Sequence, residues 1–446
     1  MNASSKSETV VLLRDLIRNA CVNDGTAESG HEYRSVETLN DYFGVEGTVF
    51  EPQPGRQSLL HRVEGADPSA PSLLLMGHTD VVAVNAAGWS VDPFAAEISD
   101  GFVWGRGAID MLNLTAAMAV AFKPFLTGEA PPPPGDLLYL AVADEEAAGT
   151  HGAKHVTDHA WDQVGADYVL TEIAYPPIDL GGGVRYPVSV GEKGPFWTHV
   201  HSTGTPGHGS TPYGSDNALE PLIGGLASLF DAPAVVGITD VWRDFVGGLG
   251  LDAELEAELS DPDRIDAAID RINASDPRLA TYLHACTHLT VSPNVIDGGV
   301  KSNVIPDTAV AQIDLRAVPG QGRDDVDRFL GKAMGRYADR LRLEPQADFA
   351  ATESRPSGSL WDVIVDACED VTGSRAVVPT LMPASTDARF FRARGSVAYG
   401  VGMFDRRVSF PDFLSMFHGN DERVSVESVG LTVTLLERVL DRWRSA

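Results

Sequence analysis

Several common features are missing from this sequence, and each absence narrows the class of protein. The 446 residues contain only three cysteines, Cys21, Cys286 and Cys368. They are too widely spaced for a disulfide framework or a cysteine-ligated metal site. No segment approaches the roughly 20 apolar residues of a membrane-spanning helix. Residues 1–8 are polar and lack the apolar core of a signal peptide, so we expect a cytoplasmic protein without a membrane partner.

Basic residues are also scarce. The chain has 34 Lys and Arg residues against 63 Asp and Glu residues, which gives a net charge of −29. This excess argues against nucleic acid or an anionic membrane as a partner, because both would be repelled. A substrate carboxylate would need local capture for the same reason. At this length the chain can bury a large core, and we expect it to divide into two domains.

Apolar runs that end in metal-ligand side chains are the most informative feature present. The run 73–76 is broken by Gly77 and followed by His78 and Asp80. An apolar run of this length, stopped by glycine, predicts a buried strand. Ligands gather at the carboxyl ends of such strands in open α/β sheets. Asp80 lies on the same side as His78 and can orient its imidazole.

The same arrangement recurs along the chain. The apolar segments 136–143 and 166–170 each end in acidic residues, and a glycine-broken turn, 105–111, leads into a segment typical of a buried helix. Another polar cluster, 417–422, precedes the final helix. These four places supply the remaining candidate ligands and a candidate base: Asp110, Glu145, Glu146, Glu172 and His418.

This donor set has a coherent chemistry. Two histidines with several carboxylates and no cysteine suit zinc or another divalent first-row metal in a catalytic site. Paired metals about 3.5–4 Å apart hold a water that attacks a carbonyl, and they need a bridging carboxylate, terminal ligands and a separate base. Any one cluster could be a solvated strand end. Together they predict a two-metal hydrolase.

With these motifs the chain resembles the M20 family of metallopeptidases and amidohydrolases. That family includes glutamate carboxypeptidase, aminoacylase, succinyl-diaminopimelate desuccinylase and acetylornithine deacetylase. The resemblance covers nearly the whole chain and is specific, because many motifs match in order. The matching segments are 77–82, 88–94, 105–111, 145–146, 207–212, 302–307, 314–316 and 386–388.

The resemblance implies a ligand set and two divalent metal ions per subunit. Asp110 would bridge both metals, His78 and Glu172 would complete one site, and Glu146 and His418 the other. Zinc is the expected metal, with cobalt and manganese as alternatives.

The resemblance also assigns catalytic and substrate-binding roles. Glu145 would be the general base, and Asp80 would hold the His78 ring. His208 would stabilise the oxyanion in the active site of the partner subunit, which implies a homodimer. Asn303 is either a turn former or a hydrogen-bond donor to substrate. Arg316 is either a surface ion-pair partner or, with its planar fork, the anchor of a substrate carboxylate.

The implied fold is α/β: a zinc-exopeptidase-like catalytic domain with a mixed central sheet and helices on both faces, plus an inserted α+β lid and dimerisation domain. Strand patterns at 196–201, 286–291 and 309–315 and helical patterns at 218–230 and 324–337 fit the lid. The expected boundaries are 1–190 and 353–446 for the catalytic domain and 191–352 for the lid.

Some segments depart from the family pattern or allow a structural explanation. Residues 231–284 exceed what the lid needs, and we expect a solvated, acidic helical hairpin on it. Leu112 and Asn113 replace the family's usual Lys-Gly and could alter the pocket wall. We expect Asp387 to cap the following helix. Further histidines are expected not to bind metal: His151, His155, His159, His199, His201, His284 and His288.

The sequence therefore predicts a two-metal enzyme that cleaves an amide bond next to a free carboxylate. Its substrate would be a small peptide, as for a dipeptidase or carboxypeptidase, or an N-acyl amino acid, as for a deacylase of the aminoacylase or desuccinylase type. The catalytic residues are common to both. A remote alternative is a non-catalytic, metal-stabilised binding protein, but such a scaffold has no use for the base Glu145.

Overall fold

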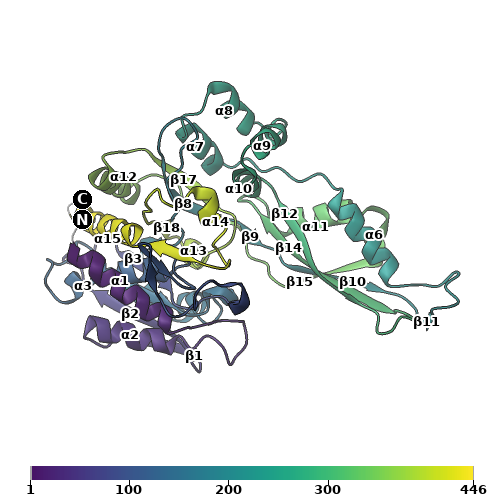
Figure 1. Cartoon of the computed structure of the whole chain (residues 1–446), viewed down its shortest axis with the longest axis horizontal. Helices are drawn as coiled ribbons and strands as arrows, with labels where there is room; N and C mark the ends of the chain where they lie inside the picture. The colour runs from purple at the N-terminus through teal and green to yellow at the C-terminus, as the bar shows by residue number, and fades with distance from the viewer. Residues whose placement is uncertain (1–2, 445–446) are drawn as a thin grey trace.

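The computed structural model describes residues 3–444 and contains a larger and a smaller body, each built on its own sheet (Figure 1). The larger sheet has nine strands in the order β1-β2-β6-β3-β7-β18-β8-β16, and β17 also pairs with β8. Its strands are β1 (Thr48–Gln53), β2 (Arg56–Val63), β3 (Leu73–His78), β6 (Leu137–Val142), β7 (Tyr168–Thr171), β8 (Tyr186–Glu192), β16 (Thr352–Glu353), β17 (Val377–Met382) and β18 (Val397–Gly400).

The centre of this sheet is parallel and buried on both faces. Strands β6, β3, β7 and β18 run parallel to one another, so their carboxyl ends share one edge. Leu73 and Leu75 of β3 pack into one hydrophobic cluster, whereas Leu74 and Met76 pack into another on the opposite face. This alternation explains the continuous apolar runs in the sequence.

Helices cover both faces. One face carries α1 (Ala3–Arg18), α2 (Tyr33–Phe43), α3 (Leu112–Leu126), α12 (Ser359–Thr372) and α15 (Val426–Trp443), and the other carries α4 (Ala153–His159), α5 (Trp161–Val164) and α13 (Ala388–Arg392). Helices α1, α3 and α15 also pack against one another. The mixed sheet with helices on both faces confirms the predicted α/β class.

The smaller body is a sheet with helices on one side. Its strands are β9 (Gly194–Pro195), β10 (Thr198–Thr203), β12 (Thr290–Gly298), β14 (Thr308–Ala317) and β15 (Leu341–Pro345), in the order β12-β14-β10-β15 with β9 on β14. One face packs on α6 (Leu219–Phe230) and α11 (Arg323–Ala333). Residues 286–287 end a helix and the strand begins at Thr290, so the strand predicted from 286 was wrong at its start.

The long segment between α6 and β12 belongs to the larger core. It forms α7 (Asp240–Gly248), α8 (Ala253–Leu259), α9 (Ile265–Asn273) and α10 (Pro277–Thr287). Trp242 and Phe245 are buried in the same cluster as the larger sheet, and α7 packs on β17. The prediction of a solvated hairpin on the lid was therefore wrong. These helices carry acidic residues on their outer faces, but their inner faces are apolar and buried.

The remaining elements are short. They are β4 (Ile98–Ser99), β5 (Phe102–Trp104), β19 (Arg423–Ser425), β11 (Gly207–His208), β13 (Val304–Ile305), α14 (Phe410–Leu414) and the 3₁₀ turns η1 (Ala86–Gly88), η2 (Glu145–Ala147) and η3 (Gly335–Arg340). Strands β11 and β13 pair at the far tip of the smaller body (Figure 1).

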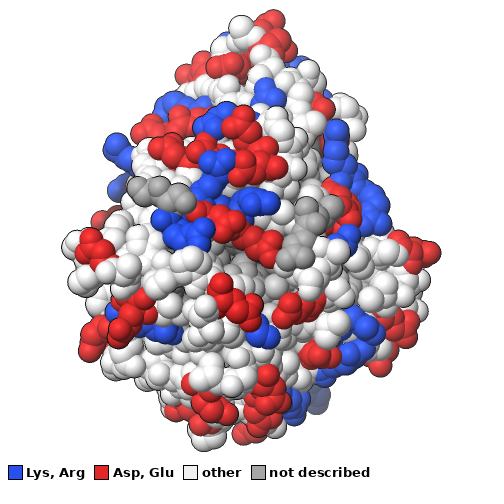
Figure 2. Space-filling view, turned by 90° about the vertical axis from the view of Figure 1, so that its left-hand side faces the viewer, with Lys and Arg blue, Asp and Glu red and all other residues white. Residues whose placement is uncertain are grey.

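Charges of both signs are interspersed on the face that carries α12 and α15 (Figure 2). Arg442 contacts Asp366 and Asp370, and Arg375 contacts Asp366 and Glu369. Much of the local acidic charge on this face is therefore paired. Among residues 3–444, no helix combines the length and apolarity needed to cross a bilayer.

Candidate active site

The predicted ligands meet at the shared carboxyl edge of the parallel strands. His78 ends β3, Glu172 follows β7, and Asp110 precedes helix α3. His78 Nε2 lies 3.3 Å from Asp110 Oδ1 and 3.7 Å from Glu172 Oε2. All three residues are buried, and one ligand atom from each lies within 4.8 Å of the others.

A second triad shares Asp110 with the first. His418 Nε2 lies 3.4 Å from Asp110 Oδ2 and 3.3 Å from Glu146 Oε2. Glu146 stands on the turn that follows β6, and His418 comes from the loop after α14. The two oxygens of Asp110 therefore face different histidines, as a carboxylate that bridges two cations must do.

The donor geometry suits divalent metals. Bonds of about 2.0–2.1 Å place two ligands of a tetrahedral zinc ion about 3.3 Å apart. The nitrogen–oxygen distances in both triads, 3.3 to 3.7 Å, are close to this separation. In addition, Glu146 Oε1 is buried and has no hydrogen-bond partner among the described residues. The residues present thus fit a pair of metal ions.

Electrostatics favour the same interpretation. Although burial opposes it, hydrogen bonding to Asp110 and Glu172 raises the pKa of His78 well above its usual value. Hydrogen bonds to Asp110 and Glu146 raise the pKa of His418 to about 10. Without metal, the surrounding carboxylates therefore favour the positively charged form of both histidines. A metal ion can supply this positive charge instead.

The neighbouring carboxyl groups are crowded. Burial and the charge of Glu172 raise the pKa of Glu145 well above its usual value. Burial and the charge of Asp110 raise the pKa of Glu146 to about 7, and burial raises the pKa of Glu172. The ion-pair partners of Asp110, Glu146 and Glu172 are histidines rather than Lys or Arg. Bound cations would relieve this repulsion.

Asp80 acts on the site through two different groups. Its main-chain carbonyl accepts a hydrogen bond from Nδ1 of His78 at 2.9 Å, whereas the nearest carboxylate oxygen is 3.6 Å away. Since a carbonyl only accepts, Nδ1 carries a proton, and Nε2 is the nitrogen that can give up its proton and bind a metal ion. The carboxylate accepts the main-chain N–H groups of Glu145 and Glu146 at 3.2 and 3.1 Å. Asp80 therefore also holds the turn that presents the base.

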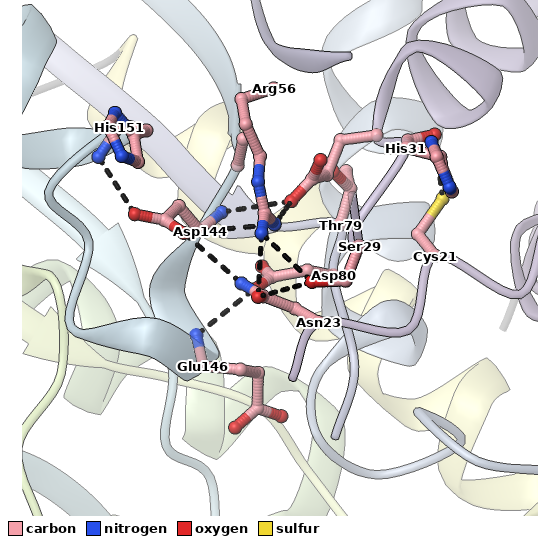
Figure 3. Close-up of polar contacts among 12 residues, drawn as sticks. Cys21, Asn23, Ser29, His31, Arg56, Thr79, Asp80, Asp144, Glu146 and His151 are labelled. Carbon is pink, nitrogen blue, oxygen red and sulfur yellow. Dashed lines mark hydrogen bonds and ion pairs between the residues drawn. The ribbon is translucent and has the colours of Figure 1, made fainter. Parts of the chain in front are cut away.

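A buried polar network supports Asp80 from behind (Figure 3). Asn23 donates from Nδ2 to Asp80 Oδ2 at 2.8 Å and to Asp144 Oδ1 at 3.2 Å. The Arg56 guanidinium, 2% exposed, lies 2.8 Å from Glu32 and 3.7 Å from Asp144. Asn23, Glu32 and Arg56 were not predicted from the sequence, because their partners are distant along the chain.

Glu422 fixes the turn that carries Asp110. It is fully buried, pairs with Arg106 at 2.6 Å and accepts the N–H groups of Ile109 and Asp110 at 2.7 and 3.2 Å. Burial raises the pKa of Glu422 to about 7, although Arg106 opposes the rise. Sequence reasoning also missed this residue; its nearness to His418 was the available signal.

Asp387 does not cap helix α13, so that prediction was wrong. Its side chain makes no capping hydrogen bond, and both carboxylate oxygens are buried without a hydrogen-bond partner among the described residues; the Arg389 guanidinium lies 3.9 Å from Oδ1. Burial raises the pKa of Asp387 to about 7; the charge of Arg389 lowers it and that of Glu172 raises it further. The charge of Asp387 in turn contributes to the raised pKa of Glu145.

Four of the five candidate ligands line a cavity of about 640 Å³ between the two bodies: Asp110, Glu146, Glu172 and His418. The larger body contributes Glu145 and Tyr175, and the smaller contributes Trp197, Arg316 and Phe349. Arg316 also contacts Asp314 at 3.1 Å. Its guanidinium thus belongs both to an ion pair and to the wall of the cavity.

Two predicted residues lie elsewhere. His208 is on β11 and Asn303 immediately precedes β13, so both are at the exposed tip of the smaller body. The Gly209 N–H donates to the Asn303 carbonyl at 2.8 Å. Neither residue lines the cavity of its own chain. Leu112 and Asn113 are buried in the first turn of α3 and are not among the residues that line it either.

Histidines and carboxylates at the carboxyl ends of parallel strands, facing a cavity, define a metal-dependent hydrolase. Comparison with known proteins gives the family. A model of peptidase family M20/M25/M40 matches residues 74–442, and the chain belongs to this family. It is a metal-dependent hydrolase that acts on amide bonds.

Similar proteins span nearly the whole chain. Aminoacylase-1 of Mus musculus is 26% identical over 407 residues, covering 90% of this chain and 88% of that protein. Succinyl-diaminopimelate desuccinylase of Rhodospirillum centenum (strain ATCC 51521 / SW) is 26% identical over 441 residues, covering 98% and 97%. The structure of an M20 family metallo-carboxypeptidase, Sso-CP2 from Sulfolobus solfataricus, matches with a TM-score of 0.74 at 18% identity, covering 98% of this chain and 100% of that one. This last likeness supports the fold.

Proposed function

We propose that the protein is a two-metal exopeptidase that cleaves an amide bond next to a free carboxylate. The observation that carries the proposal is one cavity whose wall includes residues of both triads, the extra carboxylate Glu145 and the guanidinium of Arg316. A hydrolase of this kind needs metal ligands, a base and an anchor for the substrate, and the cavity offers all three.

The metals would be held by the chain as two triads. His78 and Glu172 would bind one ion, Glu146 and His418 the other, and Asp110 would bind both. Zinc fits two imidazoles and several carboxylates, with cobalt and manganese as alternatives. When bound, such ions lower the pKa of water and polarise the carbonyl of the scissile bond.

Glu145 is the proton carrier in this proposal. It lines the cavity beside the triads without belonging to either, so its carboxylate is free to act as a base. It takes a proton from the attacking water and gives it to the leaving nitrogen. Its pKa, raised by burial and by the charge of Glu172, suits this return of the proton. Asp80 holds the turn in place through the main-chain N–H groups of Glu145 and Glu146.

The substrate carboxylate would bind Arg316. A guanidinium presents parallel N–H groups that match the two oxygens of a carboxylate. Because the net charge of the chain is −29, this local anchor must overcome long-range repulsion. Capture would exchange the contact between Arg316 and Asp314 for one with the substrate.

His208 and Asn303 would act in the partner subunit of a homodimer. Both lie at the exposed tip of the smaller body and away from the cavity of their own chain. A second chain would have to receive them, His208 as a donor to the oxyanion and Asn303 as a donor to the substrate. In this proposal residues 191–352 are the lid and dimerisation domain, between catalytic segments 1–190 and 353–446, and helices α7 to α10 within it pack back on the larger core.

A deacylase of N-acyl amino acids is the second candidate. It is favoured by two relatives, aminoacylase-1 and succinyl-diaminopimelate desuccinylase, that match most of the chain. The apolar cavity wall, with Tyr175, Phe349, Leu414 and Phe417, could receive an acyl chain. At the C-terminus of a peptide and in N-acyl amino acids alike, the amide nitrogen and the free carboxylate are attached to the same carbon atom, so one site could bind either class.

The test is a panel of dipeptides and N-acetyl, N-succinyl and N-carbamoyl amino acids, offered to zinc-loaded protein. We expect the protein to hydrolyse one of the two substrate classes, dipeptides or N-acyl amino acids. For Glu145→Gln we expect a loss of about 10²–10⁴-fold in kcat. The variant should keep the wild-type metal content, since Glu145 is outside both triads. No hydrolysis with two metals bound would favour a non-catalytic binding protein. Equal rates for wild type and variant would reject Glu145 as the base.

A further inference from the structure

A second group of metal-ligand side chains lies outside the cavity, on the smaller sheet. His199 and His201 are on β10, and Glu344 is on the neighbouring edge strand β15. One ligand atom from each of the three lies within 4.8 Å of the others. This cluster shares no residue with the proposed catalytic site.

Strand geometry places the three side chains on one face. Alternate residues of a strand point the same way. Val200 and Ser202 are buried on the side covered by helices, so His199 and His201 point to the open side. Glu344 is directly opposite His199 in the antiparallel register, which puts its carboxylate on the same open side.

The distances and chemistry suit a metal ion. His201 Nε2 lies 3.3 Å from Glu344 Oε2, which matches the separation of about 3.3 Å between two ligands of a tetrahedral zinc ion. The same nitrogen has no hydrogen-bond partner among the described residues. Two imidazoles and one carboxylate are a donor set used by zinc, with the fourth position left to water.

One cation competes for the carboxylate. Arg342 Nη1 donates to Glu344 Oε2 at 2.7 Å, and Gln346 Nε2 donates to Oε1 at 3.2 Å. The Arg342 side chain is 63% exposed, and such surface ion pairs contribute little. The guanidinium can turn into solvent and leave the carboxylate to a metal ion.

We propose that His199, His201 and Glu344 form a further metal site, which binds zinc or a chemically similar divalent ion and clamps β15 to β10. Trp197, which lines the catalytic cavity, precedes His199 by two residues, about 7 Å along the strand. The carbonyl of Trp197 accepts the N–H groups of Gln346 and Ala347, just beyond β15. Metal binding would therefore fix the strand pair that carries one wall of the cavity.

The test measures the number of Zn²⁺ ions bound per chain at equilibrium and compares each variant with wild type. The double variant His199→Ala/His201→Ala should bind one Zn²⁺ fewer per chain than wild type. The matched control is His155→Ala/His159→Ala, which removes two adjacent imidazoles from α4, 4.7 Å apart, where no ligand triad exists among the described residues. The control should bind as many ions as wild type.

A milder variant protects the test against misfolding. Glu344→Gln keeps both imidazoles, and we expect its last zinc equivalent to bind at least about 10–100-fold more weakly. Equal zinc content in wild type and the double variant would overturn the proposal. So would loss of an equivalent in the α4 control alone. Because the result is a difference, it holds whatever number of metals the catalytic cavity binds.

Discussion

Two histidine–carboxylate clusters occur in this chain, and they differ in what surrounds them. The proposed catalytic cluster is gathered from five separate segments, and His78, Asp110 and Glu172 are buried. The lid cluster comes from two neighbouring strands, and His199, His201 and Glu344 are partly exposed. Local strand geometry alone assembles the lid cluster, whereas the catalytic cluster depends on the folded core.

The supporting groups differ even more. Behind the catalytic cluster, Arg56 is buried against Glu32, and Asp80 holds two main-chain N–H groups. Beside the lid cluster, Arg342 is an exposed ion-pair partner. The same donor types therefore stand in two different surroundings, one largely buried and supported by a polar network and one partly exposed. Surrounding residues, rather than the donors, distinguish the two clusters.

Removal of the buried guanidinium should have the largest effect. Arg56→Ala removes the cation paired with the buried carboxylates of Glu32 and Asp144, so we expect a loss of about 3–5 kcal/mol in the free energy of unfolding. Arg342→Ala is the matched control on the lid and should change it by no more than about 1 kcal/mol. Urea denaturation of both metal-free variants measures the contrast. Equal losses would show that burial does not distinguish the two arginines.

The next effect concerns turnover rather than stability. His208→Ala should lower kcat about 10²–10³-fold, because one oxyanion donor is lost, while metal content stays at the wild-type level. If His208 serves the partner chain, subunits of His208→Ala mixed with subunits of Glu145→Gln should regain activity. Such a pair contains one complete site. The double variant His208→Ala/Glu145→Gln, mixed with His208→Ala, is the control and should regain none.

A smaller effect should separate the two clusters directly. Asp80→Ala frees the turn that carries Glu145 and Glu146, so we expect metal binding at the catalytic cluster to weaken about 10–100-fold. The lid cluster shares no contact with Asp80 and should keep its affinity. Zinc titration of the variant should show both classes of site. A parallel loss at the lid cluster would mean that the two are coupled.

The smallest effect is expected at the lid. Arg342→Ala removes the cation that competes for Glu344, so zinc should bind the lid cluster more tightly, by up to about fivefold. The catalytic cluster should be unaffected. Weaker zinc binding in this variant would show that Arg342 supports the cluster, which contradicts the competition.

The sequence predicted the fold and the grouping of the candidate ligands because both depend on local patterns. Apolar runs that end in His78, Glu146 or Glu172 indicate strands whose carboxyl ends meet, and the structure brings these residues together. The cytoplasmic location, the metal identity and the dimer stay predictions.

Features that depend on distant partners could not be predicted. Glu422 and Arg106 are separated by 316 residues, and only the folded chain shows their contact. Glu344 joins His199 and His201 only through the register of β10 with β15. Asp387 stands at a helix start, where capping is the usual role, but its side chain turns into the core.

The buried network also affects how related chains can be recombined. Asn23, Glu32 and Arg56 lie before the exposed loop 64–72, whereas Asp80 and Asp144 lie after it. A chimera joined within this loop would take the two halves of the network from different parents. We expect such chimeras to fold only when both parents carry the same set of charges, so these residues should be inherited as one block.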